Sequence, residues 1–197
     1  MAAQIIEIKC PGCGAQVTTG QSICDWCSNP IVISSFSSVS SMNPLQLNKY
    51  ASSYKKELQE NPDNRELNTS IGLCYLKLKM YDDAYRAFCK AVEDNFDNSE
   101  TYFYAAASAL KGRKAFLLSR PEIDRILELM NAAVMIEERG IYYYFMAYIK
   151  YDYFKRKFLT TSPSYKDYLA KAKALGCSQL DIDTMFTMMG VDKIAIV

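Results

Sequence analysis

The chain contains no histidine among its 197 residues. That absence removes the commonest general base, the Ser–His and Cys–His nucleophile pairs, and every metal site built on imidazole. Neither a P-loop nor a Gly-x-Gly-x-x-Gly sequence occurs, so two widespread nucleotide-binding motifs are also missing. These absences predict a protein that is not an enzyme.

Long apolar runs are lacking as well. No stretch of about 18 apolar residues is present, so we expect no transmembrane segment. The first ten residues, MAAQIIEIKC, have no charged leader and include Glu7, which argues against a signal peptide. We therefore expect a cytoplasmic protein whose seven cysteines are reduced. A net charge of +1 does not single out nucleic acid or an anionic membrane as the partner.

Four of the cysteines form two Cys-x-x-Cys pairs separated by ten residues. They are Cys10, Cys13, Cys24 and Cys27. Four thiolates at this spacing suit one tetrahedral Zn²⁺ ion. Because they fill all four coordination positions, we expect a closed, structural site rather than a catalytic one. The segment resembles a zinc ribbon, with Ser28 at a position where that family usually has Gly.

The predicted ribbon covers residues 1–33, with short strands expected at residues 5–8 and 31–33. A segment of this size cannot build a core alone, so the metal would supply folding energy directly. Lys9 is its only basic residue, so the ribbon lacks the positive charge that phosphate binding requires. Trp26 has two interpretations that the sequence leaves open: an exposed anchor for a protein partner, or a cover over the metal site.

Residues 65–98 have apolar positions at helical spacing on both sides of Met80-Tyr81-Asp82, which predicts two helices folded back on each other. The small residues Gly72 and Ala84 leave room for close packing, and Phe88 fills the space between turns. Together with Ile71, Tyr75 and Ala91, these residues stand at the mutual spacing of the tetratricopeptide (TPR) motif, whose repeat is about 34 residues long. The segment thus resembles a TPR unit, although Asn68 and Phe96 replace the Trp and Pro that the family prefers.

Two looser units follow, one beginning at Ser99 and one near Ile141, and each has an extended loop before its second helix. A helix from Pro44 to about Glu60 is expected before the array, and a last helix from Ser178 to Gly190 after it. We therefore predict a mainly α fold: a TPR-like solenoid of antiparallel helical hairpins with a small N-terminal zinc β-ribbon. The expected domains are the ribbon (1–33), a Ser-rich linker acting as a tether (34–44) and the helical array with capping helices (45–197).

The TPR resemblance implies a concave groove, lined by the first helix of each unit, that holds a peptide or helix of a partner protein. The positions that the resemblance assigns to this groove are Lys77, Phe103, Leu110, Lys111, Tyr142, Phe145, Ile149 and Tyr153. The alternative for the aromatic members is burial, because the sequence YYYFMAYIKYDYF is apolar almost all round its helix.

The favoured hypothesis is a non-enzymatic adaptor that binds a partner in the groove, with the ribbon as a structural or second protein-binding module. The alternative is a nucleic-acid-binding protein that uses the ribbon and two basic loops. One loop contains Lys111, Arg113, Lys114 and Arg120, and the other contains Lys150, Lys155, Arg156 and Lys157. If both loops leave the same edge of the fold, they form one basic surface for an acidic partner, RNA or anionic lipid headgroups. Solvated loop charge without a ligand is the other interpretation.

Overall fold

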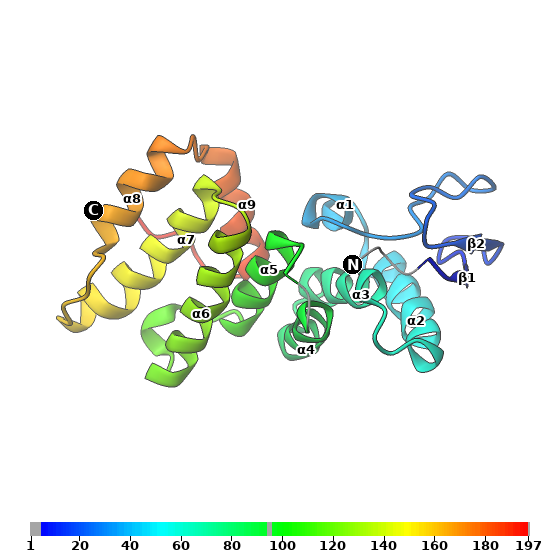
Figure 1. Ribbon diagram of the computed structural model, residues 1–197, viewed down its shortest axis with the longest axis horizontal. Helices are drawn as coiled ribbons and strands as arrows, with labels where there is room; N and C mark the ends of the chain where they lie inside the picture. Colours follow the sequence, from blue (N-terminus) through cyan, green and yellow to red (C-terminus); the bar gives the residue numbers. More distant parts are fainter. Residues whose placement is uncertain (1–4, 94–95, 197) are drawn as a thin grey trace. The chain divides into compact units, whose positions relative to one another are not determined.

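The computed structural model describes residues 5–93 and 96–196 and consists mainly of α-helices (Figure 1). The chain forms two compact units, with unit 1 ending at residue 95 and unit 2 starting at residue 96. Both units consist of TPR-like antiparallel helical hairpins, and unit 1 also holds a two-stranded sheet. The predicted fold class is confirmed.

Unit 1 contains three long helices: α2 (Pro44–Glu60), α3 (Arg65–Lys77) and α4 (Tyr81–Val92). Helix α2 has the predicted bounds, because Asn43 forms a capping box with Gln46 and Pro44 occupies the first turn. Asn64 caps α3 by accepting the Leu67 N–H group (3.0 Å). Helix α3 packs against both α2 and α4, so it forms the centre of the unit.

The small sheet differs in part from the prediction. Strand β1 (Glu7–Lys9) pairs antiparallel with β2 (Gln16–Thr18), and Glu7 lies opposite Thr18. Residues 31–33 do not form the second strand that their apolar character suggested. Their backbone instead hydrogen-bonds to side chains of α2 and α3, and Ile31 and Ile33 are fully buried. An apolar run of three residues indicates that the segment is buried. It does not indicate which groups form hydrogen bonds with its backbone.

The Ser-rich segment also differs from the expected tether. Helix α1 (Phe36–Ser40) lies within it, and the side chains of Phe36 and Val39 are buried. Helix α1 packs on α3, and the side chain of Lys77 lies over the Phe36 ring (5.9 Å to its centroid). Two apolar side chains in a serine-rich stretch are therefore sufficient to attach it to the helices.

Unit 2 comprises helices α5 (Ser99–Ala109), α6 (Arg120–Ile136), α7 (Gly140–Ile149), α8 (Tyr165–Ala174) and α9 (Gln179–Met189). Helices α5 and α6 form one hairpin and α7 and α8 form another, while α9 lies against α5 and α7. A 3₁₀ turn, η1 (Ala115–Leu117), lies in the first extended loop. Helix α7 continues into a π-helical segment, η2 (Lys150–Phe154), and a final 3₁₀ turn, η3 (Lys155–Lys157).

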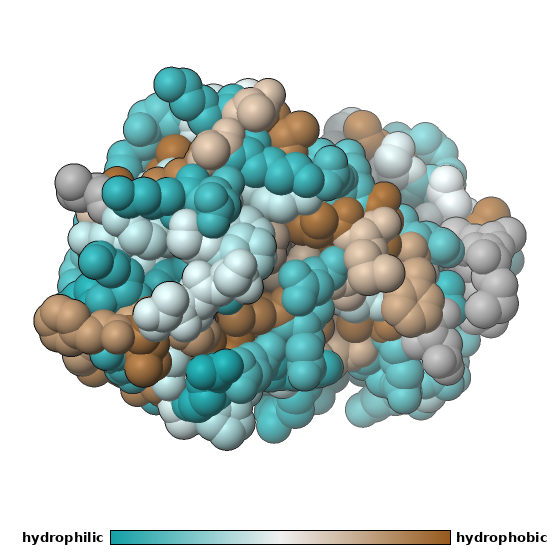
Figure 2. Space-filling view, turned by 60° about the vertical axis from the view of Figure 1, so that its left-hand side comes forward, coloured by the Kyte–Doolittle hydropathy of each residue, from teal (hydrophilic) through white to brown (hydrophobic). Residues whose placement is uncertain are grey.

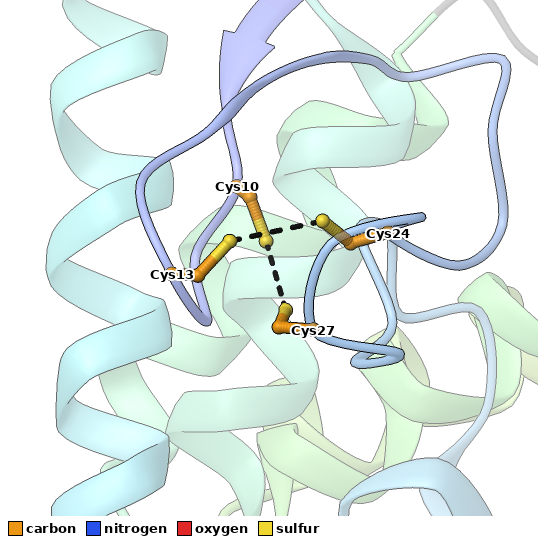
Figure 3. Close-up of side chains that lie close together, drawn as sticks. All are labelled: Cys10, Cys13, Cys24 and Cys27. Atoms are coloured by element: carbon orange, nitrogen blue, oxygen red, sulfur yellow. Dashed lines mark hydrogen bonds between the residues drawn. The ribbon is translucent and has the colours of Figure 1, made fainter.

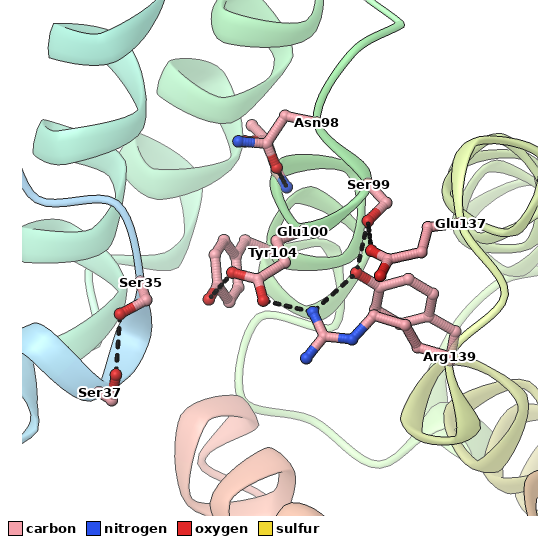
Figure 4. Close-up of polar contacts among 10 residues, drawn as sticks. Ser35, Ser37, Asn98, Ser99, Glu100, Tyr104, Glu137 and Arg139 are labelled. Atoms are coloured by element: carbon pink, nitrogen blue, oxygen red, sulfur yellow. Dashed lines mark hydrogen bonds and ion pairs between the residues drawn. The ribbon is translucent and has the colours of Figure 1, made fainter. Parts of the chain in front are cut away.

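A polar cluster joins the start of α5 to the junction between α6 and α7 (Figure 4). The Ser99 hydroxyl lies 2.8 Å from the Glu137 carboxylate, to which it donates, and 2.9 Å from the Tyr142 hydroxyl. The Arg139 guanidinium forms an ion pair with Glu100, which also accepts a hydrogen bond from Tyr104 (3.1 Å). These contacts fix how the two hairpins of unit 2 meet.

In the described parts of the chain, none of the helices combines the length and the apolar character that crossing a membrane requires.

The contact between Gly72 and Phe88 gives a stability prediction. A Cβ atom at position 72 would lie 2.6 Å from Cε1 of Phe88, whose ring is fully buried. We expect Gly72→Ala to lower the free energy of unfolding by about 1–3 kcal/mol, measured by urea denaturation. In a double-mutant cycle with Phe88→Leu, the combined loss should be smaller than the sum of the single losses, because leucine relieves the clash. Strict additivity would contradict this packing.

Candidate metal centre

The four cysteines of the ribbon bring their sulfur atoms together (Figure 3). All four Sγ atoms lie within 4.8 Å of one another. The Sγ atoms lie 3.7 Å apart in Cys10 and Cys27 and 3.8 Å apart in Cys13 and Cys24. A regular tetrahedron with metal–sulfur bonds of about 2.3 Å has edges of about 3.8 Å. The cluster therefore has the size of a four-thiolate metal site, as the sequence predicted.

Two similar turns present the thiols. In the first, the Gly14 N–H group donates to the carbonyl of Cys10 (2.9 Å), and in the second the Ser28 N–H group donates to that of Cys24 (2.8 Å). Gly14 and Ser28 both adopt left-handed backbone conformations, with φ values of 85° and 55°. Glycine adopts this conformation without steric cost, whereas serine does not. The departure from the zinc-ribbon pattern at position 28 therefore places strain in the second turn.

The pKa values of two of the thiols, Cys27 and Cys13, are shifted in opposite directions. The backbone N–H group of Asn29 lowers the pKa of the Cys27 thiol to about 7. For Cys13, the backbone N–H group of Ala15 favours the thiolate, but desolvation and the neighbouring thiols outweigh it and raise the pKa to about 11. Four sulfurs packed this closely cannot all carry a negative charge without a cation. The donor set thus favours a thiophilic divalent metal.

The ribbon is fixed to helix α2 by hydrogen bonds. The Lys49 ammonium group donates to the Gly12 carbonyl, and the Lys9 N–H group donates to the Glu57 carboxylate (3.3 Å). The Tyr50 hydroxyl donates to the carbonyl of Pro30 (3.1 Å), directly after the second turn. Burial and then the nearby thiols of Cys10 and Cys27 raise the pKa of Tyr50, in agreement with this close contact. The candidate metal centre is therefore attached directly to a helix.

Further hydroxyl groups extend this anchorage to the centre of unit 1. The Tyr54 hydroxyl donates to the Ile31 carbonyl (2.8 Å). The Ser70 hydroxyl of α3 accepts from the Ile33 N–H group (2.9 Å). Tyr50 and Tyr54 lie in the helix predicted before the array, and their hydrogen bonds to the backbone of the ribbon were not predicted. The only available signal was that a buried tyrosine hydroxyl needs a hydrogen-bond partner.

Trp26 lies in the second turn, between Cys24 and Cys27, and 79% of its surface is exposed. The indole therefore does not cover the metal site, which excludes one of its two interpretations. Ile23 of the same turn is 57% exposed. Two large apolar side chains are consequently exposed to solvent beside the thiol cluster of unit 1.

Of the three remaining cysteines, Cys74 lies in α3, Cys89 lies in α4, and Cys177 lies in the loop between α8 and α9. Cys74 is fully buried, and burial raises the pKa of its thiol to about 12. Burial also raises the pKa of Cys177, to about 11. Neither thiol forms a thiolate at neutral pH, so neither is activated as a nucleophile.

The structure places most of the predicted groove residues in the interior. Six of the eight residues are at most 6% exposed: Phe103, Leu110, Tyr142, Phe145, Ile149 and Tyr153. The Phe103 ring packs against Tyr142 (5.2 Å between centroids) and Phe145 (5.7 Å). Tyr148 meets Phe186 of α9 (5.4 Å). The predicted groove aromatics thus form the interior of unit 2, because α9 packs on α5 and α7 and closes this face.

The other two predicted groove residues, Lys77 and Lys111, reach the surface. Lys77 belongs to unit 1 and covers the Phe36 ring, while Lys111 belongs to unit 2. In the space-filling view, apolar areas are interspersed with hydrophilic ones (Figure 2).

No family model and no curated protein matches the chain. Among solved structures, the crystal structure of MamA is similar to it, with a TM-score of 0.48 and 16% sequence identity. The match covers 73% of this chain and 68% of that one. The fold is defined by the pairing of the helices of this chain, and the candidate site by the geometry of its thiols.

The strain at Ser28 is testable. Ser28→Gly should raise the free energy of unfolding of the metal-loaded protein by about 1 kcal/mol, because glycine adopts the left-handed conformation without a steric cost. Urea unfolding followed by the fluorescence of Trp26, the only tryptophan, measures this change. Ser22→Gly is the matched control: Ser22 lies in the same loop without a positive φ, so glycine should destabilise there. Equal effects of the two substitutions would contradict the assignment of strain to position 28.

Proposed function

We propose that the chain is a non-enzymatic protein-interaction scaffold in which one structural Zn²⁺ ion organises the N-terminal ribbon. The observation that carries this proposal is the close grouping of four sulfurs on turns that expose Trp26. Of the metals that accept four thiolates, Zn²⁺ needs no redox partner and takes tetrahedral geometry readily. Four protein ligands leave no open position for a substrate, which agrees with a structural role.

The ribbon is suited to contact another protein. An exposed tryptophan buries a large area at low entropic cost and is the residue type most enriched among interface hot spots. Trp26 is held between two metal ligands, and the ribbon is hydrogen-bonded to α2, so little conformational freedom remains to be lost on binding. Ile23 adds a second apolar group from the same turn. This surface takes the place of the predicted groove, whose aromatic residues are buried.

Nucleic acid is the less favoured partner of the ribbon. Glu7 and Asp25 accompany its single lysine, and a four-thiolate zinc site adds a formal charge of −2.

Reduced thiols are available in the cytoplasm, and we place the protein there.

Metal content tests the structural role. Protein prepared under reducing, zinc-replete conditions should contain one zinc ion per chain by atomic emission. A chelator should alter the emission of Trp26, because structural zinc contributes on the order of 10 kcal/mol to the folding of such sites. Cys13→Ser should lose the metal, and Cys177→Ser, outside the cluster, should retain it. A chain that binds no metal under these conditions would overturn the proposal.

Trp26→Ala tests the contact surface. Proteins that co-purify with the tagged wild-type chain from its own cells should bind the variant at least about tenfold more weakly, since loss of a hot-spot aromatic costs about 2 kcal/mol or more. Leu45→Ala is the matched control, because Leu45 is 81% exposed on the first turn of α2. Recovery of the same partners in the same amounts with Trp26→Ala would contradict a role for the ribbon surface.

A further inference from the structure

The two basic loops of unit 2 meet at one edge. The Phe116 N–H group donates to the buried Asp152 carboxylate (2.8 Å), and the Ala115 N–H group donates to the Tyr148 hydroxyl (3.2 Å). The Arg156 guanidinium lies over the Phe116 ring (4.7 Å to its centroid). These contacts join η1 to the end of α7, to η2 and to η3. We call this part of unit 2, residues 111–120 and 150–164, the basic edge.

Positive charge predominates in the basic edge. Residues 111–120 contain four Lys or Arg and residues 150–164 contain another four, whereas Asp152 is the only acid in both segments. The three arginines at positions 113, 120 and 156 form ion pairs with Glu122, Asp124 and Asp152. Within the part of the chain that the structure describes, no carboxylate lies at ion-pair distance from Lys150 or Lys155. The edge therefore carries uncompensated positive charge.

A pocket with a volume of ≈ 310 Å³ opens in this edge, and both of these lysines line it. Thr160 and Thr161 contribute hydroxyl groups, and Phe158 and Leu159 contribute apolar surface. The Lys150 ammonium group lies 4.8 Å from the centroid of the Phe154 ring, and the Arg120 guanidinium lies 5.1 Å from the centroid of the same ring. An anion in the pocket would reduce the repulsion between these cations.

The environment of Lys150 supports the same conclusion. Burial and then the charge of Arg120 lower the pKa of its ammonium group. A half-buried cation with lowered basicity gains more from an incoming anion than a solvated lysine does, because water screens it less.

Phe158 is the most exposed large apolar residue of the described chain, at 94%. It occupies the left-handed position (φ 59°) of a Schellman-type turn, in which the Leu159 N–H group donates to the Phe154 carbonyl (2.8 Å). Glycine is the usual residue there, and a bulky side chain is strained. The fold gains nothing from this ring. Leu159 (46% exposed) follows it in the chain, and Leu117 (65% exposed) lies in η1 of the same basic edge.

We propose that the basic edge docks on a membrane surface that contains anionic phospholipids. A headgroup phosphate occupies the pocket beside Lys150 and Lys155, and Phe158, Leu159 and Leu117 enter the boundary between headgroups and acyl chains. Exposed aromatic and leucine side chains surrounded by lysines have the composition of interfacial membrane anchors. A nucleic acid would need aromatic surfaces for stacking along a groove, and leucines do not provide them.

Vesicle co-sedimentation of the full, zinc-loaded chain tests the proposal. The chain should bind vesicles in which about a third of the lipid is phosphatidylglycerol and should not bind pure phosphatidylcholine; added salt should weaken the binding. Lys150→Gln and Lys155→Gln should each lower the partition coefficient about fivefold, as expected for one lysine near an anionic surface. Thermal unfolding of both variants shows whether they are folded, and Lys155 is exposed, so its replacement leaves the core intact.

Phe158→Gly separates docking from folding. It should raise the unfolding midpoint by about 2–4 °C through relief of the left-handed strain, and lower vesicle binding at least about tenfold. Lys79→Gly is the matched control, because Lys79 occupies an equivalent left-handed position (φ 62°) after α3 in unit 1. It should raise the midpoint without changing vesicle binding. Undiminished binding of Phe158→Gly to anionic vesicles would overturn the proposal. Binding of inorganic phosphate or RNA by a chain that does not bind vesicles would also overturn the proposal.

Discussion

Three hydroxyl groups connect the cysteine-containing ribbon to the helices, and the organisation of unit 1 depends on them. Tyr50 and Tyr54 donate to the Pro30 and Ile31 carbonyls, and Ser70 accepts from the N–H group of the buried Ile33. A buried backbone group that lacks a partner costs about as much as a lost hydrogen bond. The ribbon itself is too small to form an independent core. The ribbon, the linker and the first helices therefore fold as one body, in which the thiol cluster has a defined orientation.

Most of the large apolar side chains of the helical hairpins are buried inside their own unit. In unit 1, helix α1 lies on α3, and in unit 2, helix α9 packs on α5 and α7. Tyr142 and Phe145 have no exposed surface as a result. A solenoid that is closed in this way offers partners its loops and turns instead of its inner helix faces. The two candidate contacts follow this rule: Trp26 projects from a turn between two cysteines in unit 1, and Phe158 projects from a loop of unit 2.

Both contacts share a physical feature, which is a large apolar side chain held by a rigid local structure. Candidate metal ligands flank Trp26 on both sides, and a Schellman-type turn after a π-helical segment holds Phe158. Such positions lose little conformational entropy on binding, so more of the burial free energy remains for the complex. π-Helical segments are rare and often coincide with functional sites, and here the segment carries Lys150 and Phe154 into the pocket.

The sequence by itself determined the local features. Pro44 marked the start of α2, the spacing around Gly72 and Phe88 predicted the α3–α4 hairpin, and the two Cys-x-x-Cys pairs identified the candidate metal ligands. Each of these signals lies within a few turns of the chain, where backbone geometry and capping act. Only the tertiary structure decided that the ribbon docks on α2, that α9 buries the aromatic face, and that the two basic loops meet. Those outcomes depend on contacts between residues more than 20 positions apart in most cases, such as Tyr54 with Ile31 and Phe116 with Asp152. Apolar periodicity states that a face will be covered, but it does not state by which segment.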